Sequence, residues 1–125
     1  MTTMLIVDDE LDMRMLIRIV IEMANNGLSI IGEAADGVEA LALWRELDEP
    51  SLPDVVILDN RMPKLSGLEV AKQILEDKPD QLILLYSAFL DEGVRAQAQA
   101  LGITRCVSKQ ELDQLPSLIR ELTSV

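Results

Sequence analysis

The sequence predicts an α/β fold in which one parallel sheet carries helices on both faces. Two apolar runs, at residues 55–58 and 82–86, lack alternating polar residues, which is typical of strands buried on both sides. Five strand candidates alternate with five helical patterns along the 125 residues, and strict alternation favours right-handed crossovers between parallel strands. We therefore expect a doubly wound sheet in a three-layer sandwich.

The first strand and helix are expected at residues 4–7 and 11–23. The strand follows three residues that look disordered, and it ends at Asp8-Asp9-Glu10. The helical segment has an apolar surface wider than one stripe, with Leu16 among the residues expected to face the core. We interpret most of this surface as core, with a partly exposed surface for a partner as the alternative. Asn25-Asn26-Gly27 is expected to end the helix.

The second unit is a strand at residues 28–34 and a helix at residues 38–47, separated by the turn signal Asp36-Gly37. Trp44 lies on the helix face that repeats every three to four residues. We therefore interpret it as a packing residue and not as a platform for a ligand.

The third unit forms the centre of the predicted sheet. Its strand, at residues 55–58, ends at Asp59, a proline then breaks the chain, and Gly67 allows a turn. Ser66 is a suitable N-cap for the following helix, which is expected to reach residue 78. An acid at the carboxyl end of a central parallel strand lies where open α/β sheets bind ligands. A polar strand terminus without function is the alternative for Asp59.

The fourth unit is a strand at residues 82–86, ending at Ser87, and a helix between its N-cap Asp91 and Gly102.

The fifth unit begins with a short strand around Cys106-Val107, which ends at Ser108-Lys109. The last helix is expected to begin at about Asp113, because Pro116 is tolerated only within a first helical turn. The five units favour a flavodoxin-like (βα)5 sheet with strand order 2-1-3-4-5, whose switch point lies between strands one and three.

Composition limits the classes of function. The length suits a single domain over residues 1–125, and the net charge of −11 would repel both nucleic acid and anionic membranes. There is no histidine, which excludes histidine catalysis and histidine-ligated metals. One cysteine, no signal peptide and no apolar run near the roughly 20 residues of a membrane span lead us to expect a cytoplasmic protein.

Functional side chains follow four of the five strands at one predicted edge of the sheet: Asp8, Asp9, Asp59, Ser87 and Lys109. Crowded carboxylates repel one another, and a hard divalent cation such as Mg²⁺ removes that conflict. A metal, an amine and a hydroxyl around one carboxylate suit transfer of a phosphoryl group onto that carboxylate. Each of these side chains alone is weak evidence, but their presence together at successive strand ends favours such a site at Asp59.

At this point the sequence resembles the receiver domain of two-component response regulators over essentially its whole length. The marks are Val7-Asp8-Asp9-Glu10, Leu58-Asp59 with Met62-Pro63 and Gly67-Leu68-Glu69, Ser87-Ala88, and Lys109. The spacings from Asp59 to Ser87 and from Ser87 to Lys109 also match that family.

The resemblance implies a regulatory phosphoacceptor, not an enzyme with a substrate of its own. A phosphohistidine on a histidine kinase or a histidine phosphotransfer protein would phosphorylate Asp59. The resemblance also implies that Mg²⁺ is held directly by Asp9, Asp59 and the backbone carbonyl of Arg61, and by Asp8 through water. Ser87 and Lys109 would contact phosphoryl oxygens, and the signal would leave through the fourth helix, fifth strand and fifth helix to an effector protein.

Two positions depart from the family pattern. Cys106 stands where the family usually has the Tyr or Phe of a ring switch, and Phe89 or Tyr86 is a candidate substitute. Gln110 stands where the family usually has a proline after the lysine, often in a cis peptide. Because a cis non-proline bond costs about 3 kcal/mol, we expect a trans or rearranged loop, which could displace Lys109. Cys106 is interpreted as a small core residue.

Arg61 and Phe89 each stand two residues after a site residue, where the family's side chains border the path of water. We expect them to shield the acyl phosphate and slow its self-hydrolysis.

Alternatives remain. A phosphorylation-independent adaptor is the main one, because Cys106 and Gln110 weaken the expected switch. A flavodoxin-like cofactor protein is disfavoured by acids in place of a Ser/Thr/Gly-rich first loop, and an aspartate-nucleophile phosphatase by Arg61 in place of a second acid. The sequence names neither the kinase nor the output. It leaves open whether the receiver stands alone or belongs to a larger regulator, and whether two copies associate through the fourth and fifth helices.

Overall fold

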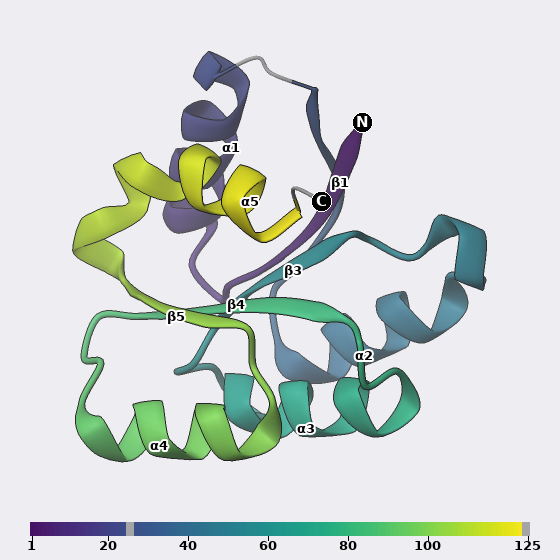
Figure 1. The fold of residues 1–125 in the computed structure, drawn as a ribbon, viewed down its shortest axis with the longest axis vertical. Coiled ribbons are helices and arrows are strands. Elements are labelled where there is room, and N and C mark those ends of the chain that lie inside the picture. Colours follow the sequence, from purple (N-terminus) through teal and green to yellow (C-terminus); the bar gives the residue numbers. More distant parts are fainter. Residues whose placement is uncertain (25–26, 124–125) are drawn as a thin grey trace.

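The computed structural model describes residues 1–24 and 27–123 (Figure 1). Five parallel strands form one sheet in the order β2-β1-β3-β4-β5, which confirms the predicted order. The strands are β1 (Thr2–Val7), β2 (Leu28–Ala34), β3 (Val55–Asp59), β4 (Leu82–Ser87) and β5 (Arg105–Ser108).

Helices cover both faces of the sheet, as predicted. Figure 1 shows α2, α3 and α4 together on one side of the sheet, with α1 and α5 on the other. The α-helices are α1 (Leu11–Ala24), α2 (Gly37–Glu46), α3 (Gly67–Asp77), α4 (Glu92–Leu101) and α5 (Leu115–Thr123), and two 3₁₀ segments are η1 (Glu49–Ser51) and η2 (Lys109–Gln114). The three-layer sandwich follows from this arrangement.

The central strand β3 explains why both faces need cover. Its five residues are all buried, and successive side chains point to opposite faces of the sheet. Val56 and Leu58 pack in the core under α2, α3 and α4, whereas Val55 and Ile57 pack in the core under α1 and α5. Each fully buried aliphatic side chain contributes roughly 1.5–3 kcal/mol relative to exposure. The two cores hold the end of β3, and therefore Asp59, in place.

Three predicted helix caps, Ser66, Asp91 and Gly102, are confirmed. Ser66 caps α3, where its hydroxyl accepts from the Glu69 backbone N–H at 3.2 Å and the Glu69 side chain bonds back to Ser66. Asp91 caps α4 by accepting from the Val94 N–H at 2.8 Å. Gly102 ends α4 with φ of 89°, a left-handed conformation that favours glycine.

The prediction that residues 1–3 lack strand structure was wrong for Thr2 and Thr3. Thr2 and Thr3 belong to β1 and pair with the start of β2. The Thr3 backbone N–H also donates to the Asp54 carboxylate at 2.8 Å. These contacts come from distant segments, so local composition does not announce them. The predicted helix end at Asn25-Asn26 lies outside the described residues.

Helix α1 exposes more apolar surface than expected. Its buried stripe follows Ile17 and Ile21, and Leu16, expected to face the core, is 45% exposed. Consecutive helical residues are about 100° apart around the axis, so Leu16 turns away when Ile17 is buried. Met15 and Met23 are also exposed. This face is therefore exposed, as in the alternative interpretation, and a partner for it stays a prediction.

The last helix begins in two stages. Residues after β5 first form η2, in which the Ser108 hydroxyl accepts from the Gln110 N–H at 3.2 Å. The α-helix then starts at Leu115, two residues later than expected, and Pro116 lies in its first turn. That position leaves the missing N–H of proline without consequence.

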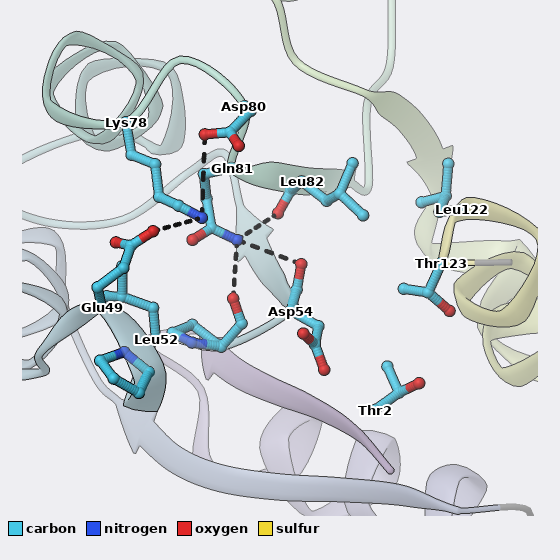
Figure 2. A pocket seen from close by; sticks show the side chains of 12 residues that line it. Thr2, Glu49, Leu52, Asp54, Lys78, Asp80, Gln81, Leu82, Leu122 and Thr123 are labelled. Atoms are coloured by element: carbon cyan, nitrogen blue, oxygen red, sulfur yellow. Dashed lines mark hydrogen bonds and ion pairs between the residues drawn. The ribbon is translucent and has the colours of Figure 1, made fainter. Parts of the chain in front are cut away.

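A hollow of about 500 Å³ lies at the amino edge of the sheet, away from the strand ends that carry the acids (Figure 2). At its floor the buried Gln81 amide donates to the backbone carbonyls of Pro53, Asp54 and Leu82 at 3.0–3.3 Å. The Gln81 side-chain oxygen accepts from the Trp44 indole N–H at 3.2 Å, which confirms Trp44 as a packing residue. This edge therefore serves stability.

No helix within the described residues is long and apolar enough to cross a membrane.

Candidate functional site

The predicted acidic edge forms where β1, β3, β4 and β5 end together. In the register of the sheet Val7 pairs with Leu58, Asp59 with Tyr86, and Ser87 with Ser108. The residues that follow these strands therefore share one edge. The burial of both faces of β3 and β4 leaves this edge as the place where polar side chains can gather.

Asp8, Asp59 and Lys109 meet at this edge. The Lys109 ammonium lies 3.4 Å from Oδ1 of Asp59 and 3.6 Å from Oδ2 of Asp8. Both acids are buried, at 0% and 2% exposure, and the lysine side chain is 17% exposed. The sequence-based expectation that these three side chains converge is thus met in space.

Burial and repulsion set the electrostatics of the group. Burial, together with the neighbouring charge of Asp8, raises the pKa of Asp59 to about 6, and Lys109 offsets part of that rise. For Lys109, burial opposes the charged form, but the carboxylates of Asp59 and Asp8 outweigh it and raise its pKa. The amine is therefore held as a cation, and the acid pair is poised to gain from a further positive charge.

A divalent cation fits the donor set. Asp8, Asp9 and Glu10 present carboxylate oxygens that lie within 4.8 Å of one another, and Asp59 lies across Lys109 from Asp8. Three carboxylates, those of Asp8, Asp59 and Glu10, thus lie within 4 Å of one ammonium, since Lys109 is also 3.8 Å from Glu10. Oxygen ligands with excess negative charge suit Mg²⁺. Glu10 was not among the predicted ligands, although its place beside Asp8-Asp9 in the sequence was the available signal.

Asp8 is held by more partners than the sequence suggested. Its Oδ1 accepts from the Glu10 backbone N–H at 2.8 Å, and its Oδ2 accepts from the Tyr86 hydroxyl at 2.6 Å. Tyr86 is completely buried. From the sequence Tyr86 was named only as a substitute for the missing switch ring; its position directly before Ser87 was the signal for a role at the acids.

Ser87 is engaged with its own loop. Its hydroxyl donates to the Phe89 carbonyl at 3.1 Å and accepts from the Phe89 N–H at 3.2 Å. To donate to a group on Asp59, the hydroxyl would have to give up its bond to the Phe89 carbonyl. The serine is therefore coupled to the backbone of Phe89.

Arg61 and Phe89 lie against each other beside this loop. The Arg61 guanidinium carbon is 5.1 Å from the centre of the Phe89 ring, within the range of a cation–π contact. Phe89 is 66% exposed. A hollow of about 590 Å³ is lined by both residues together with Ala88, Arg95, Ser108 and Gln110. Arg61 and Phe89, which were each expected to border the path of water, therefore contact each other.

The two departures from the family pattern leave the acids and the lysine together. No peptide bond among the described residues is cis, so the Lys109–Gln110 bond is trans, as expected. Lys109 is not displaced from the acids: η2 begins at Lys109 and its amine still reaches Asp59. Cys106 is half-buried against the core under α2, α3 and α4, and burial raises the pKa of its thiol. This environment agrees with a small core residue.

Comparison with known proteins gives a consistent result. The family model described as "Response regulator receiver domain" matches residues 4–120. A protein-glutamate methylesterase/protein-glutamine glutaminase of Hahella chejuensis is 33% identical over 97% of this chain and 34% of its own length. The chemotaxis protein CheY of Thermotoga maritima is 35% identical over 78% of this chain and 77% of its own. The chain thus spans about a third of the first relative and most of the second.

A solved structure extends the likeness to the fold. The response regulator protein TrrA from Thermotoga maritima, in complex with Mg²⁺ and BeF, superposes with a TM-score of 0.80 at 33% identity. The match covers 98% of this chain and 99% of that one.

Proposed function

The chain belongs to the response regulator receiver domain family, and we propose on this basis that Asp59 is the residue that accepts the phosphoryl group. As a receiver domain, the chain is a regulatory phosphoacceptor in two-component signalling. The observation that carries the assignment to Asp59 is its position: a buried carboxylate at the end of the central strand, 3.4 Å from the Lys109 ammonium. We also propose that residues 1–125 form one receiver domain.

The reaction follows from the chemistry of the carboxylate. An oxygen of Asp59 attacks the phosphorus of a phosphohistidine on a histidine kinase or histidine phosphotransfer protein. The new O–P bond makes an acyl phosphate, the N–P bond breaks, and the imidazole leaves. Asp59 must be ionised to attack, and Lys109 favours that state. Charge stabilisation and alignment supply most of the catalysis in such transfers.

Asp9, Asp59 and the carbonyl of Arg61 would hold Mg²⁺ directly, with Asp8 acting through water. The ion would supply positive charge to the phosphoryl oxygens and relieve repulsion among the acids. The support for this set is the gathering of Asp8, Asp9 and Glu10 beside the Asp59–Lys109 pair. Binding of Mg²⁺ is described for a relative of similar fold, TrrA.

Lys109 and Ser87 would contact the phosphoryl oxygens after transfer. Lys109 is already beside Asp59 and needs no rearrangement. Ser87 would first have to give up the bond that it donates to the Phe89 carbonyl. The loop of Ser87 and Phe89 would therefore move when the phosphoryl group arrives, and this movement would carry the signal towards α4, β5 and α5 and an effector protein.

A phosphorylation-independent adaptor is the second reading, and family membership with the acids and lysine in place does not favour it. The kinase, the effector and association of two copies stay open within the proposal. A pull-down that compares the phosphorylated and unphosphorylated protein would identify the partners. A partner retained equally by both forms would support the adaptor.

Intact mass spectrometry after incubation with Mg²⁺ and acetyl phosphate tests the assignment. We expect the wild-type protein to gain one phosphoryl group. Asp59→Asn should gain none, whereas Asp54→Asn, an exposed acid at the opposite end of β3, should gain one as the wild type does. A wild-type protein that stays unmodified would contradict the proposed function, and a phosphorylated Asp59→Asn would contradict the assigned residue.

A further inference from the structure

The hydroxyl of Tyr86 is buried beside the acids. Tyr86 lies at the end of β4, is 0% exposed, and is the only tyrosine in the chain. The rest of β4 before Ser87 is aliphatic. A phenylalanine would fill the same space without a hydroxyl that needs a partner, because a buried polar group costs free energy unless it is hydrogen-bonded. The hydroxyl therefore calls for an explanation beyond packing.

That hydroxyl contacts the acid which shares Lys109 with Asp59. It donates to Oδ2 of Asp8 at 2.6 Å, and the Lys109 ammonium lies 3.6 Å from the same oxygen. The ammonium also lies 5.4 Å from the centre of the Tyr86 ring and 3.4 Å from Oδ1 of Asp59. Tyr86 thus contacts two members of the site at once.

We propose that Tyr86 is a positioning residue: its hydroxyl fixes the Asp8 carboxylate and so leaves Lys109 available to Asp59 and Asp8 available to the metal. The inference rests on the proposed function. The role is one of positioning because the contacts of the Tyr86 side chain at the site are with Asp8 and Lys109 and not with Asp59 itself.

The physical reason is competition for one oxygen. Oδ1 of Asp8 is held by the Glu10 N–H, so orientation of the carboxylate depends on what binds Oδ2. With the phenol bound there, part of the negative charge is stabilised by a fixed donor. Without the phenol, the Lys109 ammonium is the remaining contact of Oδ2 among the described residues, and it would be drawn towards Asp8 and away from Asp59.

The same competition affects the metal. A free cation would have to displace the stronger Asp8–Lys109 contact before Asp8 could take part in binding. Loss of a group that orients a metal ligand without touching the metal typically weakens metal affinity by about 10- to 100-fold. We therefore expect loss of the hydroxyl to weaken Mg²⁺ binding and to slow phosphorylation together.

Tyr86→Phe tests the proposal, because it keeps the ring and removes the hydroxyl. By isothermal titration calorimetry we expect its Mg²⁺ dissociation constant to rise roughly ten-fold, and its initial rate of phosphorylation from acetyl phosphate to fall at saturating Mg²⁺. Ile17→Val is the matched control: it trims the same core under α1 and α5 without touching the acids. It should lower the melting temperature and leave both the affinity and the rate unchanged.

A double-mutant comparison identifies Asp8 as the route. On an Asp8→Asn background, Tyr86→Phe should change Mg²⁺ affinity no further, because the contact has already been altered. Unchanged affinity and rate in Tyr86→Phe, in a wild-type protein that binds Mg²⁺ and is phosphorylated, would overturn the positioning role alone. A wild-type protein that neither binds Mg²⁺ nor is phosphorylated would overturn the proposed function itself.

A measurement on the wild-type protein covers the case in which Tyr86→Phe does not fold. Tyrosine labelled with ¹³C at Cζ gives one resonance, because the chain has one tyrosine. Mg²⁺ should shift that resonance with the midpoint found by calorimetry. A resonance that does not move while the metal binds would overturn the proposal.

Discussion

Lys109 places its ammonium 3.4 Å from Oδ1 of Asp59, so the fold itself holds the proposed phosphoacceptor beside its cation. The pair lies at the end of the most deeply buried strand and includes Asp8 as a third member. Because these three charged side chains are largely buried, the stability of the protein should be sensitive to the loss of any one of them. Without the amine, the remaining charges would be buried without compensation.

Removal of the amine should destabilise the protein. Lys109→Met leaves Asp8 and Asp59 buried side by side, so we expect the free energy of unfolding in EDTA to fall by about 2–4 kcal/mol. Urea unfolding at neutral pH measures this. Lys64→Met is the control, because Lys64 is 63% exposed and pairs with Asp36 at the surface; its loss should cost less than about 1 kcal/mol. Equal effects of the two variants would contradict the buried role of Lys109.

The pKa of Asp59 predicts how stability depends on pH. Because burial and Asp8 raise it from 3.8 to about 6, the folded protein binds this proton more tightly than the unfolded chain does. The resulting stability is complete below about pH 4 and is lost as the pH rises through about 6. At pH 7.5 without divalent cations the ionised Asp59 should therefore cost up to about 3 kcal/mol.

Asp59→Asn removes that cost. In EDTA we expect its gain in unfolding free energy over the wild type to be larger at pH 7.5 than at pH 4.5, by about 1–3 kcal/mol. Asp113→Asn, at an exposed acid, should show no such difference. Parallel pH profiles of unfolding free energy for Asp59→Asn and the wild type would show that the pKa of Asp59 is not raised in the folded protein.

The contact between Arg61 and Phe89 predicts a long-lived acyl phosphate. A ring and a guanidinium packed 5.1 Å apart can restrict water near Asp59. Phe89→Ala and Arg61→Ala should each release phosphate faster, by roughly ten-fold, equivalent to about 1.4 kcal/mol of barrier. Loss of the phosphoryl mass with time measures the rate, and Met23→Ala, at an exposed residue at the far end of α1, should match the wild type. Release as slow in both site variants as in the wild type would count against shielding.

Much of the fold could be predicted because its signals are local. The uninterrupted apolar runs of β3 and β4, the capping residues Ser66 and Asp91, and the left-handed Gly102 each act through their immediate neighbours. The acidic edge could be predicted too, because parallel strands must end together. These features need no knowledge of distant contacts beyond strand order.

Other features depend on partners remote in sequence. Thr2 and Thr3 join β1 only because β2 and Asp54 lie beside them. The contact of Tyr86 with Asp8 joins residues 78 positions apart, so the place of Tyr86 before Ser87 suggests that it lies near the acids but not which acid it contacts. Lys109 stays in place because η2 holds it, whereas the absence of proline after it suggested displacement.

Gly67 is needed for a close approach of two backbone segments, which differs from the turn that the sequence predicted. It was expected to allow a turn, but a Cβ at this position would lie 2.3 Å from the Asp59 carbonyl oxygen. Its N–H also donates to the Asn60 carbonyl at 2.8 Å, which ties the start of α3 to the end of β3. The backbone of this glycine thus packs directly against the end of β3.

Gly67→Ala should therefore be costly. Overpacking against fixed backbone typically costs about 1–3 kcal/mol or more, so we expect at least that loss in urea unfolding. Weaker Mg²⁺ binding should accompany it, because Asp59 would shift. Gly93→Ala, in the first turn of α4, is the control: its Cβ would meet only the side chain of Asp91, and helix propensity favours alanine by about 1 kcal/mol. A tolerated Gly67→Ala would show that the loop after β3 can move freely.

Gln81 provides a prediction at the opposite edge of the sheet. Its amide joins the amino ends of β3 and β4 by donating to three backbone carbonyls (Figure 2). Its oxygen accepts from Trp44 and so joins these strand ends to α2. Gln81→Met keeps the length of the side chain but leaves those groups without a partner. An unsatisfied buried polar group costs about 1–3 kcal/mol, so we expect a loss at or above the upper end of that range.

The expected loss can be separated from any effect on signalling. Because Gln81 is far from the acids along the strands, Gln81→Met should lower the urea midpoint yet keep the wild-type rate of phosphorylation and the wild-type affinity for Mg²⁺. The emission of Trp44, the only tryptophan, should change as its indole loses an acceptor. Gln99→Met, on the exposed face of α4, should change none of these. A Gln81→Met protein as stable as the wild type would mean that water replaces the amide. The Gln81 hydrogen bonds at this edge would then contribute little to the stability of the fold.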